Sequence, residues 1–169
     1  MDKILVISGP TASGKSGLAL RIAEAQLVVG RSSLIINADS LQIYQGLPIL
    51  SSQPSEQELE QVPHALYSHF ASDQYSSVGM WLSLVKEAVE GAIKEGKLPI
   101  IVGGSGMYIS KLIDGISEIP EIDDEIRNEA RQLFDNVGFD KMQEKLFDLG
   151  GDEMMDKQRL IRAYEVLRK

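Results

Sequence analysis

Three short segments carry residues that could bind and process a phosphorylated ligand. The first has the form G-x-x-x-x-G-K-[ST] and reads Gly9, Pro10, Thr11, Ala12, Ser13, Gly14, Lys15 and Ser16. In such a loop the glycines let backbone N–H groups point at phosphate oxygens, while Lys15 adds a positive charge. The Ser16 hydroxyl can hold a phosphate-bound Mg²⁺ ion. These residues predict a site for a di- or triphosphate with magnesium.

The other two segments each follow an apolar run that is typical of a strand. Asp39 begins the second segment, which reads DSLQIY and ends at Tyr44. The third reads GGSGMY from Gly103 to Tyr108 and contains the hydroxyl of Ser105. Because ligands bind at the carboxyl ends of the strands in open α/β sheets, we expect both segments beside the phosphate loop. The predicted pocket therefore has a phosphate cradle on one side and a carboxylate and a hydroxyl on the other.

The elements that must position these segments alternate between strands and helices. Apolar runs predict strands at Ile4–Ser8, Ser33–Ala38 and Leu98–Val102, and the run Ile4–Ile7 has the character of a buried strand. Helical patterns predict helices over Lys15–Val28, from Ser76 or Ser77 to Glu95 with Gly96 as the stop, and from Gly106 to about Gly115. The apolar stripe of the second helix is expected to pack on the sheet and consists of Trp81, Leu84, Val85, Ala88 and Ala92. This alternation predicts a parallel sheet covered by helices.

The pattern changes after a predicted linker at Ile116–Pro120. The rest of the chain is acidic and has helical but no strand periodicity. Three helices are expected: one capped by Asp123 and closed by Gly138, one over Met142–Leu149, and one capped by Asp156. We therefore expect an α/β core with a P-loop NTPase-like parallel sheet at 1–115 and a small all-helical appendage at 116–169.

Composition narrows the possible classes of protein. The 169 residues are 43% hydrophobic and include no cysteine and two histidines, which argues against disulfides and against thiolate or histidine zinc sites. A net charge of −8, with neither half of the chain basic, is unusual for a nucleic-acid binder. The sequence contains no membrane-length apolar run, and Met1–Lys3 leads directly into a strand without a secretory signal. We expect a cytoplasmic, monomeric protein with no membrane contact.

The order of motifs resembles that of the tRNA dimethylallyltransferases, also called tRNA isopentenyltransferases. The resemblance rests on GPTASGKS at 9–16, DSLQIY at 39–44, Val62-Pro63-His64, LPIIVGGSGMY at 98–108 and QRLIRAYEV at 158–166. It extends over the whole chain at similar spacing. It implies transfer of the dimethylallyl group from dimethylallyl diphosphate to the exocyclic amine of the adenine just 3′ of a tRNA anticodon.

The resemblance also implies roles for individual residues. Asp39 would act as the general base and Ser105 as a second catalytic residue, at a position where the family usually has threonine. The phosphate loop would hold the diphosphate, and the Ser16 hydroxyl its Mg²⁺. The implied contacts with the tRNA anticodon stem-loop are Asp39, Ser40, Leu41, Gln42, Ser105, Arg127, Gln158, Arg159, Leu160, Ile161 and Arg162. The target base must leave the anticodon-loop stack to reach the donor.

Several alternatives remain open from the residues alone. Asp39 could cap a strand end or bind magnesium, and the three arginines at 127, 159 and 162 could form ion pairs with acids at helical spacing. The phosphate loop also suits a small-molecule kinase, although the helices after Pro120 lack an arginine-rich lid. Where the family has Gly-Thr-Ala-Lys-Pro, this chain has Leu50-Ser51-Ser52-Gln53-Pro54, without the glycine and the lysine. Family members continue past Lys169, so we expect a truncated chain, in the extreme an inactive phosphate-binding fragment.

Overall fold

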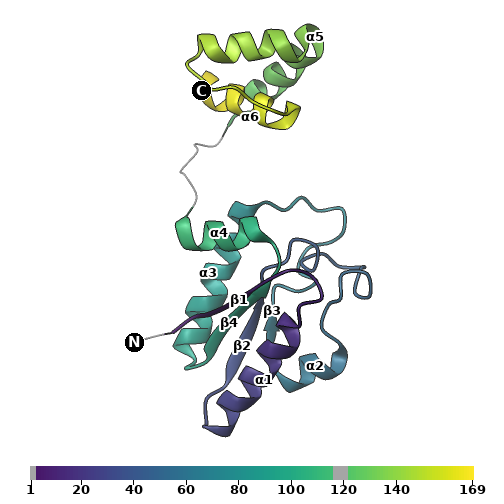
Figure 1. Cartoon of the computed structure of the whole chain (residues 1–169), viewed down its shortest axis with the longest axis vertical. Coiled ribbons are helices and arrows are strands. Elements are labelled where there is room, and N and C mark those ends of the chain that lie inside the picture. Colours follow the sequence, from purple (N-terminus) through teal and green to yellow (C-terminus); the bar gives the residue numbers. More distant parts are fainter. Residues whose placement is uncertain (1–2, 116–121) are drawn as a thin grey trace. The chain divides into compact units, whose positions relative to one another are not determined.

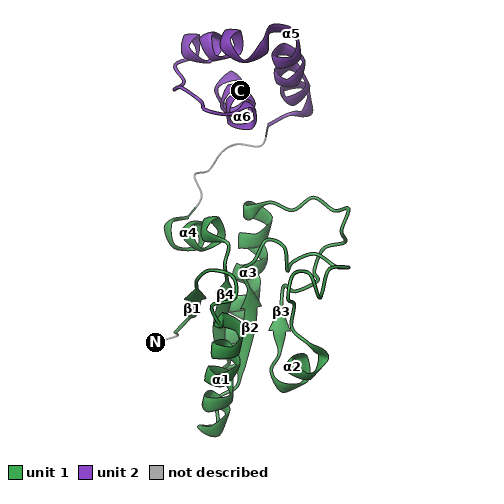
Figure 2. Cartoon of the chain, turned by 45° about the vertical axis from the view of Figure 1, so that its right-hand side comes forward, with its two compact units in different colours: residues 1–116 green, residues 117–169 purple. Residues whose placement is uncertain are grey.

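The computed structural model describes residues 3–115 and 122–169, so the predicted linker at 116–120 lies outside the described residues. The chain divides into two compact units, residues 1–116 and 117–169 (Figure 2). Across both described ranges, no helix is long and apolar enough to cross a membrane.

The first unit is built on a parallel sheet of four strands in the order β1-β4-β2-β3. The strands are β1 (Leu5–Ser8), β2 (Ser33–Asn37), β3 (His64–Ala65) and β4 (Leu98–Gly103). Leu5 pairs with Ile100 across β1 and β4, and Ile35 pairs with Ile100 across β2 and β4. The three predicted strands are confirmed, whereas the two-residue strand β3 is too short to leave a periodic pattern in the sequence.

Four helices accompany this sheet in the first unit (Figure 1). They are α1 (Lys15–Val28), α2 (Glu56–Gln61), α3 (Val78–Lys94) and α4 (Gly106–Asp114). Three of them are confirmed predictions. The side chain of Ser77 caps α3 by accepting from Met80 N–H, and Gly96 and Gly115 follow α3 and α4 with positive φ. The unpredicted α2 is a six-residue helix that begins with a capping box between Ser55 and Glu58.

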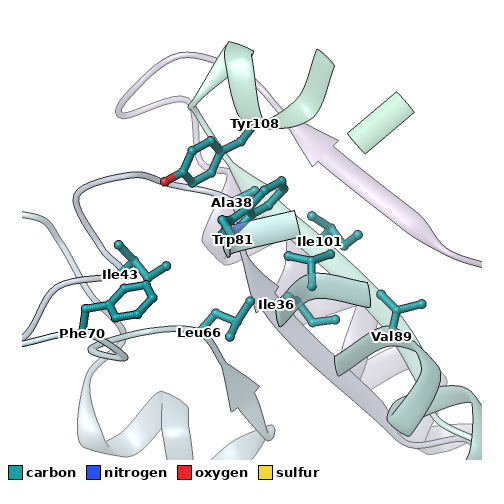
Figure 3. Packing of buried hydrophobic residues seen from close by; sticks show 10 residues of the cluster. Ile36, Ala38, Ile43, Leu66, Phe70, Trp81, Val89, Ile101 and Tyr108 are labelled. Carbon is teal, nitrogen blue, oxygen red and sulfur yellow. The ribbon is translucent and has the colours of Figure 1, made fainter. Parts of the chain in front are cut away.

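The two faces of the sheet are covered by different helices. Ile35 and Ile100 belong to a core with Ala19 and Ala23 of α1, while Ile36 and Ile101 belong to a core with α3 and α4. The predicted stripe of α3 does pack on the sheet, and its Trp81 is fully buried and donates a hydrogen bond to the Asn37 carbonyl. Figure 3 shows Trp81 beneath Tyr108, whose ring stacks on the indole at 4.3 Å between ring centroids. The sheet is thus the middle of three layers, with α1 on one face and α3 and α4 on the other, and these layers hold the carboxyl ends of its strands in place.

The expectation that Ile4–Ile7 forms a buried strand is wrong. Among the described residues β1 pairs only with β4, so it forms an edge of the sheet. Its burial alternates, and Ile4 and Val6 remain 50% and 37% exposed. Val6 is paired with Ile101, which α3 covers, but α3 packs on β2 and β4 rather than on β1. An apolar run alone could not distinguish an edge strand from a central one.

The second unit contains α5 (Asp124–Asp148) and α6 (Lys157–Arg168) around a core of its own. The backbone of α5 breaks at Gly138, where φ is 78°, so this glycine ends the first helical segment as predicted. The next segment starts earlier than the predicted Met142. Asp156 caps α6 by accepting from Arg159 N–H, whereas Asp123 occupies the N-cap of α5 without a side-chain capping bond.

Candidate active site

The phosphate loop joins β1 to α1 at the carboxyl edge of the sheet. Gly14 stands at the N-cap of α1 with φ 82°, a left-handed conformation that glycine adopts at little cost. No side chain caps this helix, so its first N–H groups remain available to an anion. Lys15 folds back over the loop and donates from Nζ to the Pro10 carbonyl at 2.6 Å. This hydrogen bond holds the Lys15 ammonium against the backbone of the phosphate loop.

Asp39 lies just beyond β2, where a buried amide fixes the backbone. The Asn37 side chain accepts from Asp39 N–H at 2.8 Å and donates to the carbonyls of Asp39 and Leu66 at 2.9 and 3.0 Å. Asn37 is fully buried. The Asp39 carboxylate, in turn, accepts from Leu41 N–H through Oδ1 at 2.9 Å. The carboxylate is therefore held in one orientation by its own strand end.

The glycine-rich turn after β4 approaches that strand end more closely than any side chain would allow. A Cβ on Gly103 would lie 2.0 Å from the Ala38 carbonyl oxygen. Ser105 then accepts from Ser40 N–H through Oγ at 2.9 Å and lies 3.2 Å from the Ser40 hydroxyl. Ser105 thus fixes the residue that follows Asp39.

Gly104 brings the loop and the carboxylate into one pocket. A Cβ placed on Gly104 would lie 3.2 Å from the Gly9 carbonyl, 3.7 Å from Asp39 Oδ2 and 3.8 Å from Lys15 Nζ. Glycine at this position lets the lysine and the carboxylate face the same space. That space is a pocket of about 460 Å³ lined by residues 11–17, 39, 41–42, 50–52 and 102–103. All three segments contribute to this pocket, the third through Gly103, whereas the expected Ser105 hydroxyl is not among the lining residues.

The donor set of this pocket fits a magnesium ion. Mg²⁺ binds hard oxygen ligands and usually keeps waters and substrate phosphates in its shell. The Ser16 hydroxyl and the Asp39 carboxylate both line the pocket. The described residues contain no group of three or more acids, histidines or cysteines that could hold a metal alone. A magnesium ion here would therefore depend on phosphate oxygens of a bound ligand.

The neighbouring residues of the predicted site have distinct surroundings. Leu41 is 62% exposed and borders the pocket. Gln42 donates to the carbonyls of Ser51 and Ser52 at 2.8 and 3.3 Å, so its side chain is tied to the loop at residues 50–54. Within that loop Gln53 donates to the carbonyls of Gln42 and Tyr44. Gln53 thus anchors the segment that follows Asp39.

His64 lies behind the phosphate loop, beside a smaller cavity that Ser16 also lines. Its Nδ1 is 2.7 Å from the Val62 carbonyl, and its ring meets Tyr67 edge to face. Burial lowers the pKa of His64 and raises that of the Tyr67 phenol. The imidazole is therefore a hydrogen-bonded structural group.

The predicted RNA contacts of the second unit differ in exposure, and their arginines have acidic partners. Each arginine has an acidic partner three residues away: Arg127 has Asp124, Arg159 has Asp156, and Arg162 has Glu165. Gln158, Arg159 and Arg162 are exposed and Ile161 is half-buried. Leu160 is fully buried in the core of this unit, so its side chain packs there.

Sequence reasoning missed the two amides that support the site, Asn37 and Gln53. Asn37 left a weak signal, because a polar residue ends an otherwise apolar strand one position before Ala38-Asp39. Gln53 left none that a single sequence offers, since its three partners are a backbone carbonyl of Gln42, one of Tyr44 and the hydroxyl of Ser68. Long-range contacts of this kind become visible only in the folded chain.

Comparison with known proteins places this architecture among tRNA-modifying enzymes. A family model described as IPP transferase matches residues 42–169. Curated tRNA dimethylallyltransferases from Rhodospirillum rubrum and Ehrlichia chaffeensis are 43% and 40% identical to this chain, over 98% and 99% of it. The alignments cover 51% and 54% of those relatives, so the chain spans about half the length of the curated relatives it matches.

Solved structures agree with these sequence matches. The full-length tRNA isopentenylpyrophosphate transferase from Bacillus halodurans aligns with 99% of this chain and 56% of its own, at a TM-score of 0.64 and 26% identity. A eukaryotic dimethylallyltransferase acting on tRNA aligns with 98% of this chain and 41% of its own, at a TM-score of 0.79 and 24% identity, which speaks for the fold alone. The P-loop NTPase-like α/β class expected from the sequence is confirmed by these neighbours.

Proposed function

Because the chain belongs to the IPP transferase family, we propose that it transfers the dimethylallyl group of dimethylallyl diphosphate to the N6 amine of an adenine 3′-adjacent to a tRNA anticodon. One observation carries the proposal: a single pocket joins a phosphate loop to a carboxylate at the carboxyl edge of the sheet. A phosphate cradle alone suits many ligands. A fixed base beside it suits a reaction in which diphosphate leaves while a weak amine must lose a proton.

The bond changes assign roles to the residues of the loop. A bond forms between adenine N6 and the allylic carbon, and the bond from that carbon to the diphosphate oxygen breaks, so diphosphate departs with the electron pair. Negative charge grows on the departing oxygen. The Lys15 ammonium and the free N–H groups at the start of α1 stabilise this charge. Magnesium on Ser16 and the phosphate oxygens would supply further positive charge when bound.

Asp39 is proposed to take the proton that N6 loses. The lone pair of an adenine amine is delocalised into the ring, so the amine needs a base as its new bond forms. Oδ1 of Asp39 is engaged with Leu41 N–H, which leaves Oδ2, the oxygen that faces Gly104, as the acceptor. Ser105 acts through position, because its hydroxyl holds the Ser40 backbone next to the carboxylate.

The donor half of the proposal is tested by ligand binding. Dimethylallyl diphosphate with magnesium should raise the unfolding midpoint of the chain, and Lys15→Ala should remove the shift because the loop loses its charge. Stabilisation by ATP but not by dimethylallyl diphosphate would contradict the proposal and favour a kinase.

The transfer half is tested with Asp39→Asn and a radiolabelled donor. The variant should bind the donor as the unsubstituted chain does, because the phosphate loop is unchanged. It should transfer label to an anticodon stem-loop at least about a hundredfold more slowly, as expected when a general base is removed. Equal transfer by both chains would exclude Asp39 as the base.

A further inference from the structure

One wall of the phosphate pocket has no role in the function proposed so far. It consists of Leu50, Ser51 and Ser52 and is called the serine wall below. Ser52 lines the phosphate pocket and also the smaller cavity behind the phosphate loop, and so does Ser16. The two serines therefore lie where these spaces meet, so Ser52 borders the same part of the pocket as the proposed magnesium ligand.

Two glutamine side chains hold the serine wall in place. Gln42 Nε2 donates to the carbonyls of Ser51 and Ser52 at 2.8 and 3.3 Å. Gln53 Nε2 donates in return to the Gln42 carbonyl at 3.1 Å, and its Oε1 accepts from the Ser68 hydroxyl at 2.6 Å. Each glutamine thus binds the backbone of the other's segment. We call this reciprocal pair the glutamine clasp.

The backbone and the hydroxyl of Ser52 are both unusual. Its φ is 54°, in the left-handed region that costs free energy in a residue other than glycine. Among the residues that the structure describes, its hydroxyl has no recorded hydrogen-bond partner. The Ser51 hydroxyl, in contrast, already donates to the Leu47 carbonyl at 2.6 Å. Of the two hydroxyls in the serine wall, that of Ser52 is thus the one free to donate into the pocket.

A free hydroxyl at this place suits a phosphate oxygen. The donors already assigned to the diphosphate, Lys15 and the first N–H groups of α1, all belong to the phosphate loop and the helix that follows it. The serine wall lines another part of the same pocket and has no charged side chain. A serine hydroxyl can donate one hydrogen bond, and such a bond is stronger to an ionised oxygen than to a neutral one.

We propose that Ser52 Oγ donates a hydrogen bond to a non-bridging oxygen of the bound diphosphate, and that the glutamine clasp positions Ser52 for this contact. The hydroxyl adds a neutral donor to a site whose positive charge comes from the loop. The identification of this diphosphate as the leaving group of a prenyl donor rests on the function proposed above. In that reaction the hydroxyl also stabilises the charge that grows on the diphosphate as it departs.

The contact is tested by calorimetric titration of the chain with inorganic diphosphate and Mg²⁺. Ser52→Ala should weaken the affinity about tenfold, as expected when a charged acceptor loses one hydrogen bond. Ser52→Gly should weaken it equally, although glycine adopts a φ of 54° without strain and should give a higher urea midpoint than alanine. The loss would then follow the hydroxyl and not the stability of the loop. The control Ser83→Ala removes an exposed hydroxyl of α3 outside the pocket and should bind normally.

The positioning role of the glutamine clasp is tested with a double-mutant cycle. Gln53→Met has a side chain of similar length but lacks its hydrogen bonds, and it should weaken diphosphate binding about fivefold. In the Ser52→Ala chain the same change should cost less than about twofold, because the hydroxyl that the clasp positions is already absent. Additive losses would overturn the positioning role.

Diphosphate affinity that survives in Ser52→Ala, or that returns in Ser52→Gly, excludes the contact. The first result leaves the hydroxyl without effect, and the second assigns the loss to the loop backbone. Parallel titrations with dimethylallyl diphosphate separate this contact from the function on which it rests. Ser52-dependent binding of inorganic diphosphate without binding of dimethylallyl diphosphate would support the contact and overturn prenyl transfer. Equal binding of the prenyl donor by Ser52→Ala and the unsubstituted chain would exclude the contact and leave the proposed function intact.

Discussion

At the scale of single residues, the site depends on buried groups that do not touch the pocket. The side-chain amide of Asn37 makes three hydrogen bonds with backbone groups. Its backbone carbonyl separately accepts a hydrogen bond from the Trp81 indole. Its burial makes each of those bonds worth more than an exposed one, because an unpaired buried polar group is costly. Asp39 owes its orientation to this arrangement. The orientation of the Asp39 carboxylate is therefore set by a buried side chain that does not itself line the pocket.

His64 provides a prediction on pH and stability. Burial lowers the pKa of its imidazole in the folded chain, while the unfolded chain keeps the ordinary value of about 6.5. As pH falls through that value, the unfolded state binds a proton that the folded state does not, so folding stability decreases. The free energy of unfolding should thus fall more between pH 7.5 and 5.5 in the unsubstituted chain than in His64→Gln. Urea titrations at both pH values measure it, with His69→Gln, which removes an exposed histidine, as the control.

At the scale of elements, the turns that follow β2 and β4 determine the geometry of the site as much as the strands do. β4 ends where its chain passes directly over the carbonyl of Ala38, the residue between β2 and Asp39. Ala38 N–H donates to the Val102 carbonyl at 2.7 Å, and Ser105 N–H donates to the Ala38 carbonyl. These two hydrogen bonds join the ends of β2 and β4. Only a glycine at 103 allows the β4 backbone to lie this close to the Ala38 carbonyl.

Two glycine substitutions test this account in opposite directions. Gly103→Ala should destabilise the chain by about 3 kcal/mol, because the new Cβ would displace the Ala38 backbone. Gly91→Ala, in the middle of α3, should stabilise it by about 0.5 to 1 kcal/mol, since its Cβ would meet no atom within 4 Å. Chemical denaturation measures both changes. A tolerated Gly103→Ala would show that the two strand ends can separate without cost.

At the scale of the whole molecule, ligand binding should act on one compact unit. The phosphate pocket is formed entirely by residues of the first unit, and the second unit has its own buried core. The only tryptophan, Trp81, is fully buried in the first unit and reports on its unfolding alone. Far-ultraviolet circular dichroism, in contrast, reports on helices of both units.

Dimethylallyl diphosphate at about a hundred times its dissociation constant should therefore stabilise the Trp81 transition by about 2.7 kcal/mol. The dichroism transition should then broaden or split, because the pocket is lined by residues of the first unit. Lys15→Ala is the control and should leave both transitions in place. Equal shifts in both signals would mean that the two units unfold as one cooperative body.

The sequence by itself determined the local features of this protein. Phosphate-loop residues, helix caps and glycine stops act through neighbours a few positions away, so the helices α1, α3 and α4 and the three longer strands could be predicted with close boundaries. The same locality made the candidate residues 9–16, 39 and 105 identifiable, and the order of motifs indicated the family.

Only the tertiary structure decided how these local features meet. It made β1 an edge strand with Val6 exposed and buried Leu160 in a core. It also brought Tyr44, Ser76 and Tyr108 together around one hollow from three separate segments. The reason is physical: burial, strand order and long-range hydrogen bonds depend on which distant residues pack together, and a pattern read along one chain contains no measure of that distance.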